Sequence, residues 1–122
     1  MAKGKFATSV SCMDGRIQIP LTIWIKENFS VDYVDTITEP GIDKQVADNT
    51  DLESIKTKVG ISINKHESEL IVVSGHYDCA GNPVSNEHIT QIKKGIEVIS
   101  SWNLGVKVVG VWVDDTWKIN TV

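Results

Sequence analysis

The sequence predicts a single α/β domain in which helices cover both faces of a mostly parallel sheet, so that the domain has three layers. Short β-rich runs alternate with longer amphipathic stretches along the chain, which is typical of βαβ units. Leu70–Val73 is a continuous apolar run, as expected of a strand buried on both faces. The 122 residues, 41% of them hydrophobic, suffice for one core and are too few for two. We therefore expect one domain spanning residues 1–122.

The expected strands are runs rich in β-branched and aromatic residues that end at turn formers. Four strands are expected, at Phe6–Ser11, Val31–Thr38, Leu70–Val73 and Val106–Val113, and Trp117–Val122 suits a short additional edge strand. The pair Pro40 and Gly41 closes the second strand, because this dipeptide is typical of turns.

The expected helices are stretches in which apolar residues recur at intervals of three and four. The first is expected over Pro20–Asn28, because proline suits the first turn of a helix. The second is expected over Asp51–His66, where Thr50 and Glu53 have the spacing of a capping box. The third carries a stripe of isoleucines and follows Ser85, which we expect to be its N-cap.

The alternation of strands and helices also predicts where a ligand would bind. Right-handed crossovers place helices on both faces of the sheet, and the simplest strand order is 2-1-3-4. In an open parallel sheet, ligands bind beyond the carboxyl ends of the strands, at the point where the strand order reverses. This point lies between the first and third strands, so the loops after Ser11 and Ser74 are the informative ones. Both cysteines of the chain fall in these loops.

Composition and charge disfavour several classes of function. Sixteen acidic against twelve basic residues leave a formal charge of −4, which disfavours a nucleic-acid partner. No apolar run approaches the roughly 20 residues that span a bilayer, so no membrane partner is expected. The start, Met1–Lys5, does not predict a secretory signal. Two cysteines without such a signal favour a reducing, cytoplasmic environment, where thiols more often serve metals or catalysis than structure.

Cys12, His76 and Cys79 are expected to converge on this crevice, although they are far apart in the sequence. Two thiolates and one imidazole are a set of ligands that zinc prefers, and three protein ligands leave a fourth position for water. Zinc would lower the pKa of that water toward about 7 and so provide a hydroxide at neutral pH. A structural cysteine pair, or a disulfide across the crevice, is the alternative.

Arg16 is the only arginine among the twelve basic residues, and Asp14 lies two positions before it. A guanidinium grips a carboxylate with two parallel hydrogen bonds, which an ammonium cannot do. Held in this way, Asp14 would stay ionised and could orient a metal-bound hydroxide toward a substrate. A salt bridge that only fixes the loop is the alternative.

These residues resemble a known family. The pattern Cys-x-Asp-x-Arg at Cys12, Asp14 and Arg16, followed by Gly-His-x-x-Cys from Gly75 to Cys79, is similar to that of the β-class carbonic anhydrases. The resemblance implies Zn²⁺ as cofactor, held by Cys12, His76 and Cys79, with Asp14 and Arg16 as a catalytic dyad beside it. It also implies a lyase in which zinc hydroxide attacks carbon dioxide to give bicarbonate. Related members hydrolyse carbonyl sulfide or carbon disulfide.

The sequence departs from this family at several points. The family's Arg-Asn-Ala-Gly-Asn-like segment is replaced by Thr38–Asp43, and its glycine after the second cysteine is Ala80, with Gly81 one place on. The first strand begins near Phe6, which leaves no room for the family's N-terminal helical arm. Zinc binding is expected to survive these changes better than hydration activity. A non-catalytic zinc-binding protein on the same fold, or a hydrolase of another small electrophile such as carbonyl sulfide, is the alternative.

Two further groups of residues complete these expectations. His66 and His88 are expected to be solvated surface residues at helix ends. The tryptophans Trp102, Trp112 and Trp117 form either part of the core or an apolar patch at a subunit interface. If they form such a patch, we expect a homodimer.

Overall fold

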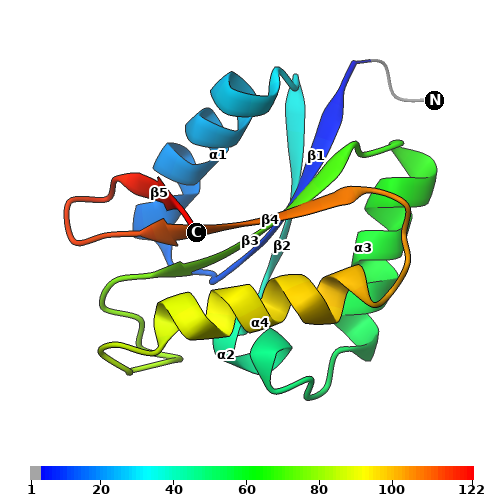
Figure 1. Cartoon of the computed structure of the whole chain (residues 1–122). Coiled ribbons are helices and arrows are strands. Elements are labelled where there is room, and N and C mark those ends of the chain that lie inside the picture. The colour runs from blue at the N-terminus through cyan, green and yellow to red at the C-terminus, as the bar shows by residue number, and fades with distance from the viewer. Residues whose placement is uncertain (1–3) are drawn as a thin grey trace.

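A computed structural model describes residues 4–122 and shows a central sheet with helices on both faces (Figure 1). The strands are β1 (Phe6–Ser11), β2 (Tyr33–Thr38), β3 (Leu70–His76), β4 (Lys107–Val113) and β5 (Ile119–Thr121). The helices are α1 (Gly15–Phe29), α2 (Ile42–Ala47), α3 (Glu53–Lys65) and α4 (His88–Ser100). The expectation about a secretory signal falls partly on residues 1–3, which lie outside the described residues. Within residues 4–122, no helix is long and apolar enough to cross a membrane.

The strands lie in the order β2-β1-β3-β4-β5, which confirms the predicted fold class, the order of the first four strands and the additional edge strand. β1 pairs in parallel with β2 and β3, and β3 pairs in parallel with β4. β5 runs antiparallel to β4, so the sheet is mixed but mostly parallel. The carboxyl ends of β1 and β3 therefore lie side by side at the point where the strand order reverses.

The helices form two layers of unequal size. α1 lies on one face of the sheet, whereas α2, α3 and α4 lie on the other (Figure 1). Leu21 of α1 packs in one core with Val72 of β3, and Ile92 of α4 packs in the other core with Val73. Neighbouring residues of β3 thus point to opposite faces, which explains why every residue of the run Leu70–Val73 is apolar.

α1 begins at Gly15, before the predicted start at Pro20. Asp14 caps the helix, since its carboxylate accepts a hydrogen bond of 2.8 Å from the backbone N–H of Arg16. Pro20 therefore lies inside the helix rather than in its first turn, and the prediction of its position was wrong.

The starts of the other helices also differ from the prediction. α2 was not predicted, because its six residues are too few to show a helical period. The capping box before α3 is absent, since the Thr50 hydroxyl donates to the carbonyl of Asp48 instead. Ser85 is not the cap of α4, which begins at His88 without a side-chain cap.

β3 is longer than predicted and extends to His76, whereas the sequence placed a loop from Gly75 onward. The additional residues pair with β4, with Gly75 opposite Trp112 and His76 opposite Val113. All seven residues of β3 are buried. His76 is therefore held by the sheet rather than by a loop, so the backbone position from which its side chain extends is fixed.

Gly75 allows α2 to pack closely against the sheet. A Cβ at this position would collide with the Asp43 carboxylate and lie 3.2 Å from Cδ1 of Ile92. Asp43 is only 2% exposed, so its side chain has no open space into which to move. The missing side chain of Gly75 is thus what lets a buried carboxylate rest on the strand that carries His76.

We expect Gly75→Ala to lower the free energy of unfolding by about 1–3 kcal/mol, the usual cost of overpacking a buried site. Gly60→Ala in α3 is the matched control, because a Cβ there would meet only Asn64 Nδ2, at 4.0 Å, and alanine is the better helix former. Urea unfolding of both variants measures the difference. A Gly75→Ala protein as stable as the wild type would contradict this packing.

Candidate metal centre

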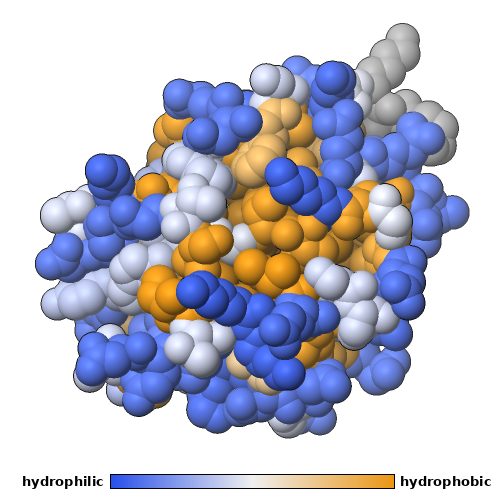
Figure 2. Space-filling view, viewed as in Figure 1, coloured by the Kyte–Doolittle hydropathy of each residue, from blue (hydrophilic) through white to orange (hydrophobic). Residues whose placement is uncertain are grey.

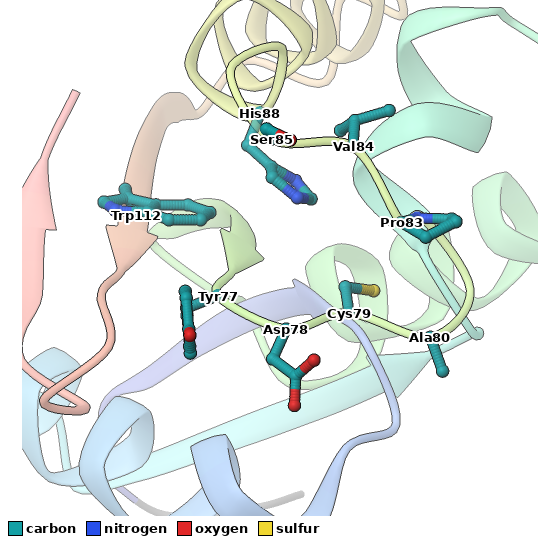
Figure 3. Close-up of a pocket in the computed structure, with 9 residues that line it drawn as sticks. All are labelled: Tyr77, Asp78, Cys79, Ala80, Pro83, Val84, Ser85, His88 and Trp112. Carbon is teal, nitrogen blue, oxygen red and sulfur yellow. The ribbon is translucent and has the colours of Figure 1, made fainter.

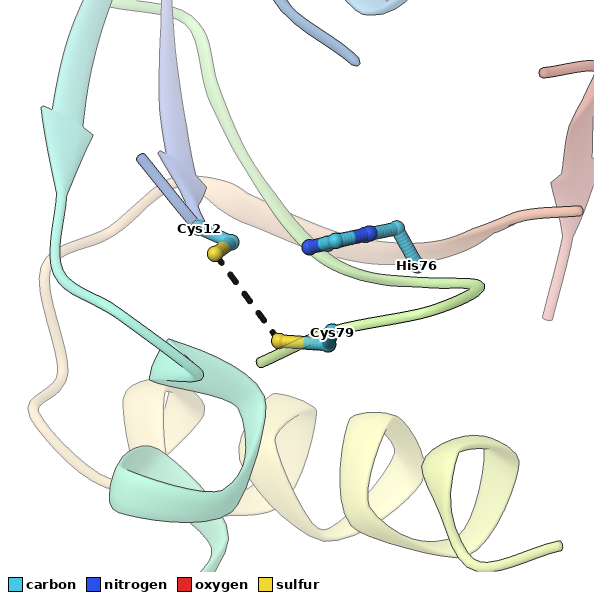
Figure 4. Close-up of side chains that lie close together, drawn as sticks. All are labelled: Cys12, His76 and Cys79. Atoms are coloured by element: carbon cyan, nitrogen blue, oxygen red, sulfur yellow. Dashed lines mark hydrogen bonds between the residues drawn. The ribbon is translucent and has the colours of Figure 1, made fainter. Parts of the chain in front are cut away.

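Cys12, His76 and Cys79 meet at the carboxyl ends of β1 and β3 (Figure 4). One donor atom from each residue lies within 4.8 Å of the other two. Cys12 directly follows β1, His76 ends β3, and Cys79 lies in the loop after it. All three are buried, and the most exposed, Cys12, is only 7% exposed. The structure therefore brings together the three side chains that the sequence predicted to converge.

The imidazole of His76 has one nitrogen satisfied and one free. Nδ1 lies 2.7 Å from the carbonyl oxygen of Tyr77, and because a carbonyl only accepts, Nδ1 carries the proton. Nε2 then presents a lone pair, and it is buried without a hydrogen-bond partner among the described residues. Figure 4 shows this end of the ring directed toward the two sulfur atoms. A buried acceptor without a partner is costly, so this atom needs a ligand.

The two sulfur atoms lie 3.8 Å apart, and both cysteines are free thiols rather than a disulfide. The backbone N–H of Gly41 donates to Cys12 Sγ at 3.5 Å. Burial raises the pKa of the Cys79 thiol to about 11, and the neighbouring Cys12 adds to this rise. A bound cation would reverse the effect, because a metal stabilises its thiolate ligands. Two sulfurs and an unpartnered imidazole nitrogen at this spacing fit zinc.

The loop that carries Cys79 rests against the turn that follows β2. A Cβ on Gly81 would lie 2.6 Å from the backbone nitrogen of Gly41 and 2.7 Å from the carbonyl carbon of Pro40. The two backbones touch because neither glycine has a side chain. The turn from Pro40 is therefore packed directly behind the loop of Cys79, and its backbone N–H reaches Cys12.

Asp14 and Arg16 form the ion pair that the sequence predicted. Nη2 and Nε of Arg16 donate to the Asp14 carboxylate at 2.7 Å and 3.0 Å, so the contact is bidentate. The hydrogen bonds from Arg16 lower the pKa of Asp14 to about 2, and the carboxylate stays ionised at neutral pH. Its Oδ2 lies 4.0 Å from Nε2 of His76. An anionic oxygen is thus held near the free nitrogen of His76.

Arg16 is also held from two other sides. Its guanidinium donates to the Asp78 carboxylate at 3.2 Å and to the Asp78 carbonyl at 3.1 Å. It stacks on the ring of Trp117, with Cζ 4.8 Å from the ring centroid.

Trp117 lies in the turn between β4 and β5, which the Asp114 carboxylate organises by accepting hydrogen bonds from Thr116 and Asn120. These hydrogen bonds hold the pKa of Asp114 well below its usual range.

The family described as "Putative carbonic anhydrase" matches residues 2–122. The chain belongs to this family. No curated protein matches the sequence.

Three solved structures share the fold of this carbonic anhydrase family member. The β-carbonic anhydrase isoform I of Trichomonas vaginalis aligns with a TM-score of 0.65 at 17% identity, covering 99% of this chain and 86% of that one. A carbonic anhydrase from Glaciozyma antarctica aligns at 0.62 with 14% identity, covering 93% and 80%. The β-carbonic anhydrase CafA of Aspergillus fumigatus aligns at 0.55 with 11% identity, covering 97% and 74%. At these identities the likeness concerns the fold.

The chain also contains a buried polar cluster that the sequence did not predict. His88, expected at the surface, is 3% exposed, and its Nδ1 contacts the Asp43 carboxylate. Asn82 joins them, with Nδ2 donating to Asp43 Oδ1 at 3.0 Å and to Gln91 Oε1 at 2.6 Å. The cluster links the loop of Cys79 to α2 and α4. No local pattern could have revealed it, because Asp43 and His88 are 45 residues apart.

A cavity of about 380 Å³ opens between the loop of Cys79, the start of α4 and β4 (Figure 3). The walls include both aromatic and titratable groups. They are formed by Tyr77, Asp78, Cys79, Ala80, Pro83, Val84, Ser85, His88 and Trp112. One residue of the candidate metal centre and one of the polar cluster thus face the same space.

Proposed function

We propose that the chain is a zinc-dependent carbonic anhydrase that interconverts carbon dioxide and bicarbonate. Cys12, His76 and Cys79 would hold the zinc ion. The observation that carries the proposal is Nε2 of His76, which is buried without a partner and directed at two buried sulfur atoms. Membership of the carbonic anhydrase family supports the choice of a small-molecule substrate. When bound, zinc would supply a hydroxide nucleophile at neutral pH by lowering the pKa of a coordinated water.

The residues beside the metal centre would orient the reacting groups. Asp14 is ionised, and its Oδ2 lies 4.0 Å from Nε2 of His76, so it can accept a hydrogen bond from the nucleophile and fix its direction. Arg16 holds Asp14 in place through two hydrogen bonds, and Asp78 and Trp117 hold Arg16. The dyad is thus positioned by the loops after β1 and β3 and by the turn between β4 and β5. Orientation of this kind lowers the barrier of a reaction between two small molecules.

The same proposal places the chain in a reducing, cytoplasmic compartment, because two free thiols 3.8 Å apart remain available to a metal there. We also propose that residues 1–122 form one functional domain.

We expect Cys79→Ser to abolish zinc retention, because a serine hydroxyl is a poor zinc ligand and the remaining donors are only two. Asp78→Asn, next to Cys79, is the matched control and should keep about one zinc per chain, since it removes no donor. Elemental analysis of protein purified under reducing conditions without chelator measures the stoichiometry. Wild-type protein that carries no tightly bound metal would refute the proposed zinc centre.

We expect Asp14→Asn to retain zinc and to lose about 10²- to 10³-fold in kcat/KM for carbon dioxide hydration, a usual cost for removing one oriented charged group. The asparagine keeps the shape of the side chain but not its charge. Stopped-flow hydration assays measure the rate, with Asp51→Asn, an exposed residue before α3 that lies outside the site, as the control. Zinc-loaded wild-type protein that never exceeds the buffer rate would instead favour a non-catalytic zinc-binding protein.

We also propose a homodimer, with the apolar surface around β4 as its interface. Eight hydrophobic residues pack on the larger core while remaining partly exposed, namely Ile63, Ile96, Trp102, Leu104, Val106, Val108, Trp112 and Val122. Apolar side chains gather in the middle of the face that Figure 2 shows.

Sedimentation velocity of the wild type should give twice the chain mass, and the Val108→Glu variant should have the mass of one chain. A wild-type monomer at micromolar concentration would contradict the dimer.

A further inference from the structure

The polar cluster of Asp43, Asn82 and His88 has no part in the metal centre, yet it contains a buried ion-pairing dyad. The side chains of His88 and Asp43 are 4% and 2% exposed. Burying a carboxylate and an imidazole costs free energy unless each is paired and hydrogen-bonded. Both oxygens of Asp43 are satisfied, Oδ1 by Asn82 and Oδ2 by His88. The fold therefore maintains this dyad at a fixed place, with His88 in the wall of the cavity.

The contacts of the His88 ring determine which nitrogen can exchange a proton. Nδ1 donates to the Asp43 carboxylate, so its proton is retained in both protonation states of the ring. The ring of Trp112 packs against the imidazole at a tilt of 33°, with 4.9 Å between centroids, and restricts its rotation. Among the described residues, the hydrogen-bond contacts of the ring all involve Nδ1, and none involves Nε2. Proton exchange at this side chain thus takes place at Nε2.

Figure 3 shows the imidazole of His88 extending from the start of α4 into the cavity that Cys79 also lines. The cavity, of about 380 Å³, has room for several water molecules. The other titratable groups in its wall are less suited to exchange protons. Asp78 is ion-paired with Arg16, and Cys79 belongs to the metal centre. The side chain of Tyr77 is exposed to solvent rather than enclosed in the cavity.

We propose that His88, oriented by Asp43, is the proton-transfer residue of this protein, an inference that rests on the proposed hydration of carbon dioxide. Adding water to carbon dioxide gives bicarbonate and one proton, and that proton must leave the metal centre in every turnover. Water in the cavity passes it to Nε2 of His88, which becomes an imidazolium, and a buffer base then removes it. Imidazole is the side chain that gains and loses a proton near neutral pH.

Asp43 acts as a positioning residue. Its carboxylate holds the proton on Nδ1 and offsets the positive charge of the imidazolium when Nε2 is protonated, as the aspartate of an Asp–His pair does. Gly75 leaves the space for this carboxylate, and Asn82 ties it to the loop of Cys79. The dyad and the metal centre are therefore attached to the same strand and the same loop.

The test compares His88→Asn with His66→Asn in zinc-loaded protein. An asparagine at position 88 can still donate to Asp43, so the buried carboxylate keeps a partner, but it cannot carry the proton. His66 is the matched control because its Nδ1 pairs with Asp35 at 2.7 Å in a similar way, while it does not line the cavity. Stopped-flow hydration is measured at low buffer concentration, with zinc content and thermal stability recorded for each variant.

We expect His88→Asn to lower kcat about tenfold or more at low buffer, within the range of general acid–base effects, and to leave kcat/KM unchanged. Added imidazole should restore kcat, because it replaces the missing base, whereas a merely structural defect would not respond. His66→Asn should behave as the wild type. Unchanged kcat in His88→Asn, or a loss that imidazole does not restore while zinc content is intact, would overturn the role of His88.

Nuclear magnetic resonance of ¹⁵N-labelled protein gives a readout that does not depend on activity. The His88 ring should keep its proton on Nδ1 while Nε2 titrates with pH, and Asp43→Asn should change that titration. A ring that does not titrate between pH 5 and 9 would overturn the proposal. Zinc-loaded wild-type protein without hydration activity would overturn the proposed function and this inference with it. If the wild type is active and His88→Asn is equally active at low buffer, the inference alone is overturned.

Discussion

The parallel pairing of β1 with β3 is the constraint on which the other features of this protein depend. Thr8, Ser9 and Val10 are in register with Ile71, Val72 and Val73, which aligns the carboxyl ends of two strands far apart in the sequence. The loop after each strand then contributes sulfur, and the end of β3 contributes an imidazole. Because both strands are completely buried, their ends cannot shift relative to one another without breaking the core.

The chemistry of the centre follows from what burial does to its groups. Nε2 of His76 lies in a place from which water is largely excluded, and the thiol of Cys79 is kept protonated by the same burial. A cation bound among these atoms removes both penalties at once. Asp14 differs, because Arg16 stabilises its charge with two hydrogen bonds at the rim of the site. The site therefore combines buried sulfur and nitrogen donor atoms with one carboxylate, that of Asp14, which is fixed at the rim.

Close backbone contacts connect this centre to the cavity behind it. Gly41 and Gly81 touch behind the loop of Cys79, and Gly75 leaves space for the Asp43 carboxylate. Through Asn82 this carboxylate is bonded to the same loop, and through His88 it reaches the cavity. The residues of the segment Thr38–Asp43, in which the sequence departs from the β-class pattern, thus form part of the support of the loop that carries Cys79.

The sequence by itself determined the order of the four main strands, the mostly parallel sheet and the convergence of Cys12, His76 and Cys79. Each of these follows from local signals, namely apolar runs, turn formers and the place of each residue relative to a strand end. The start of α1 also follows from a local signal, the cap at Asp14, which the prediction missed because it relied on Pro20. The short helix α2 and the burial of His88 were decided by the tertiary structure. A helix of six residues shows no helical period, and His88 is buried by a carboxylate 45 residues away in the sequence, so both arise only when distant segments pack together.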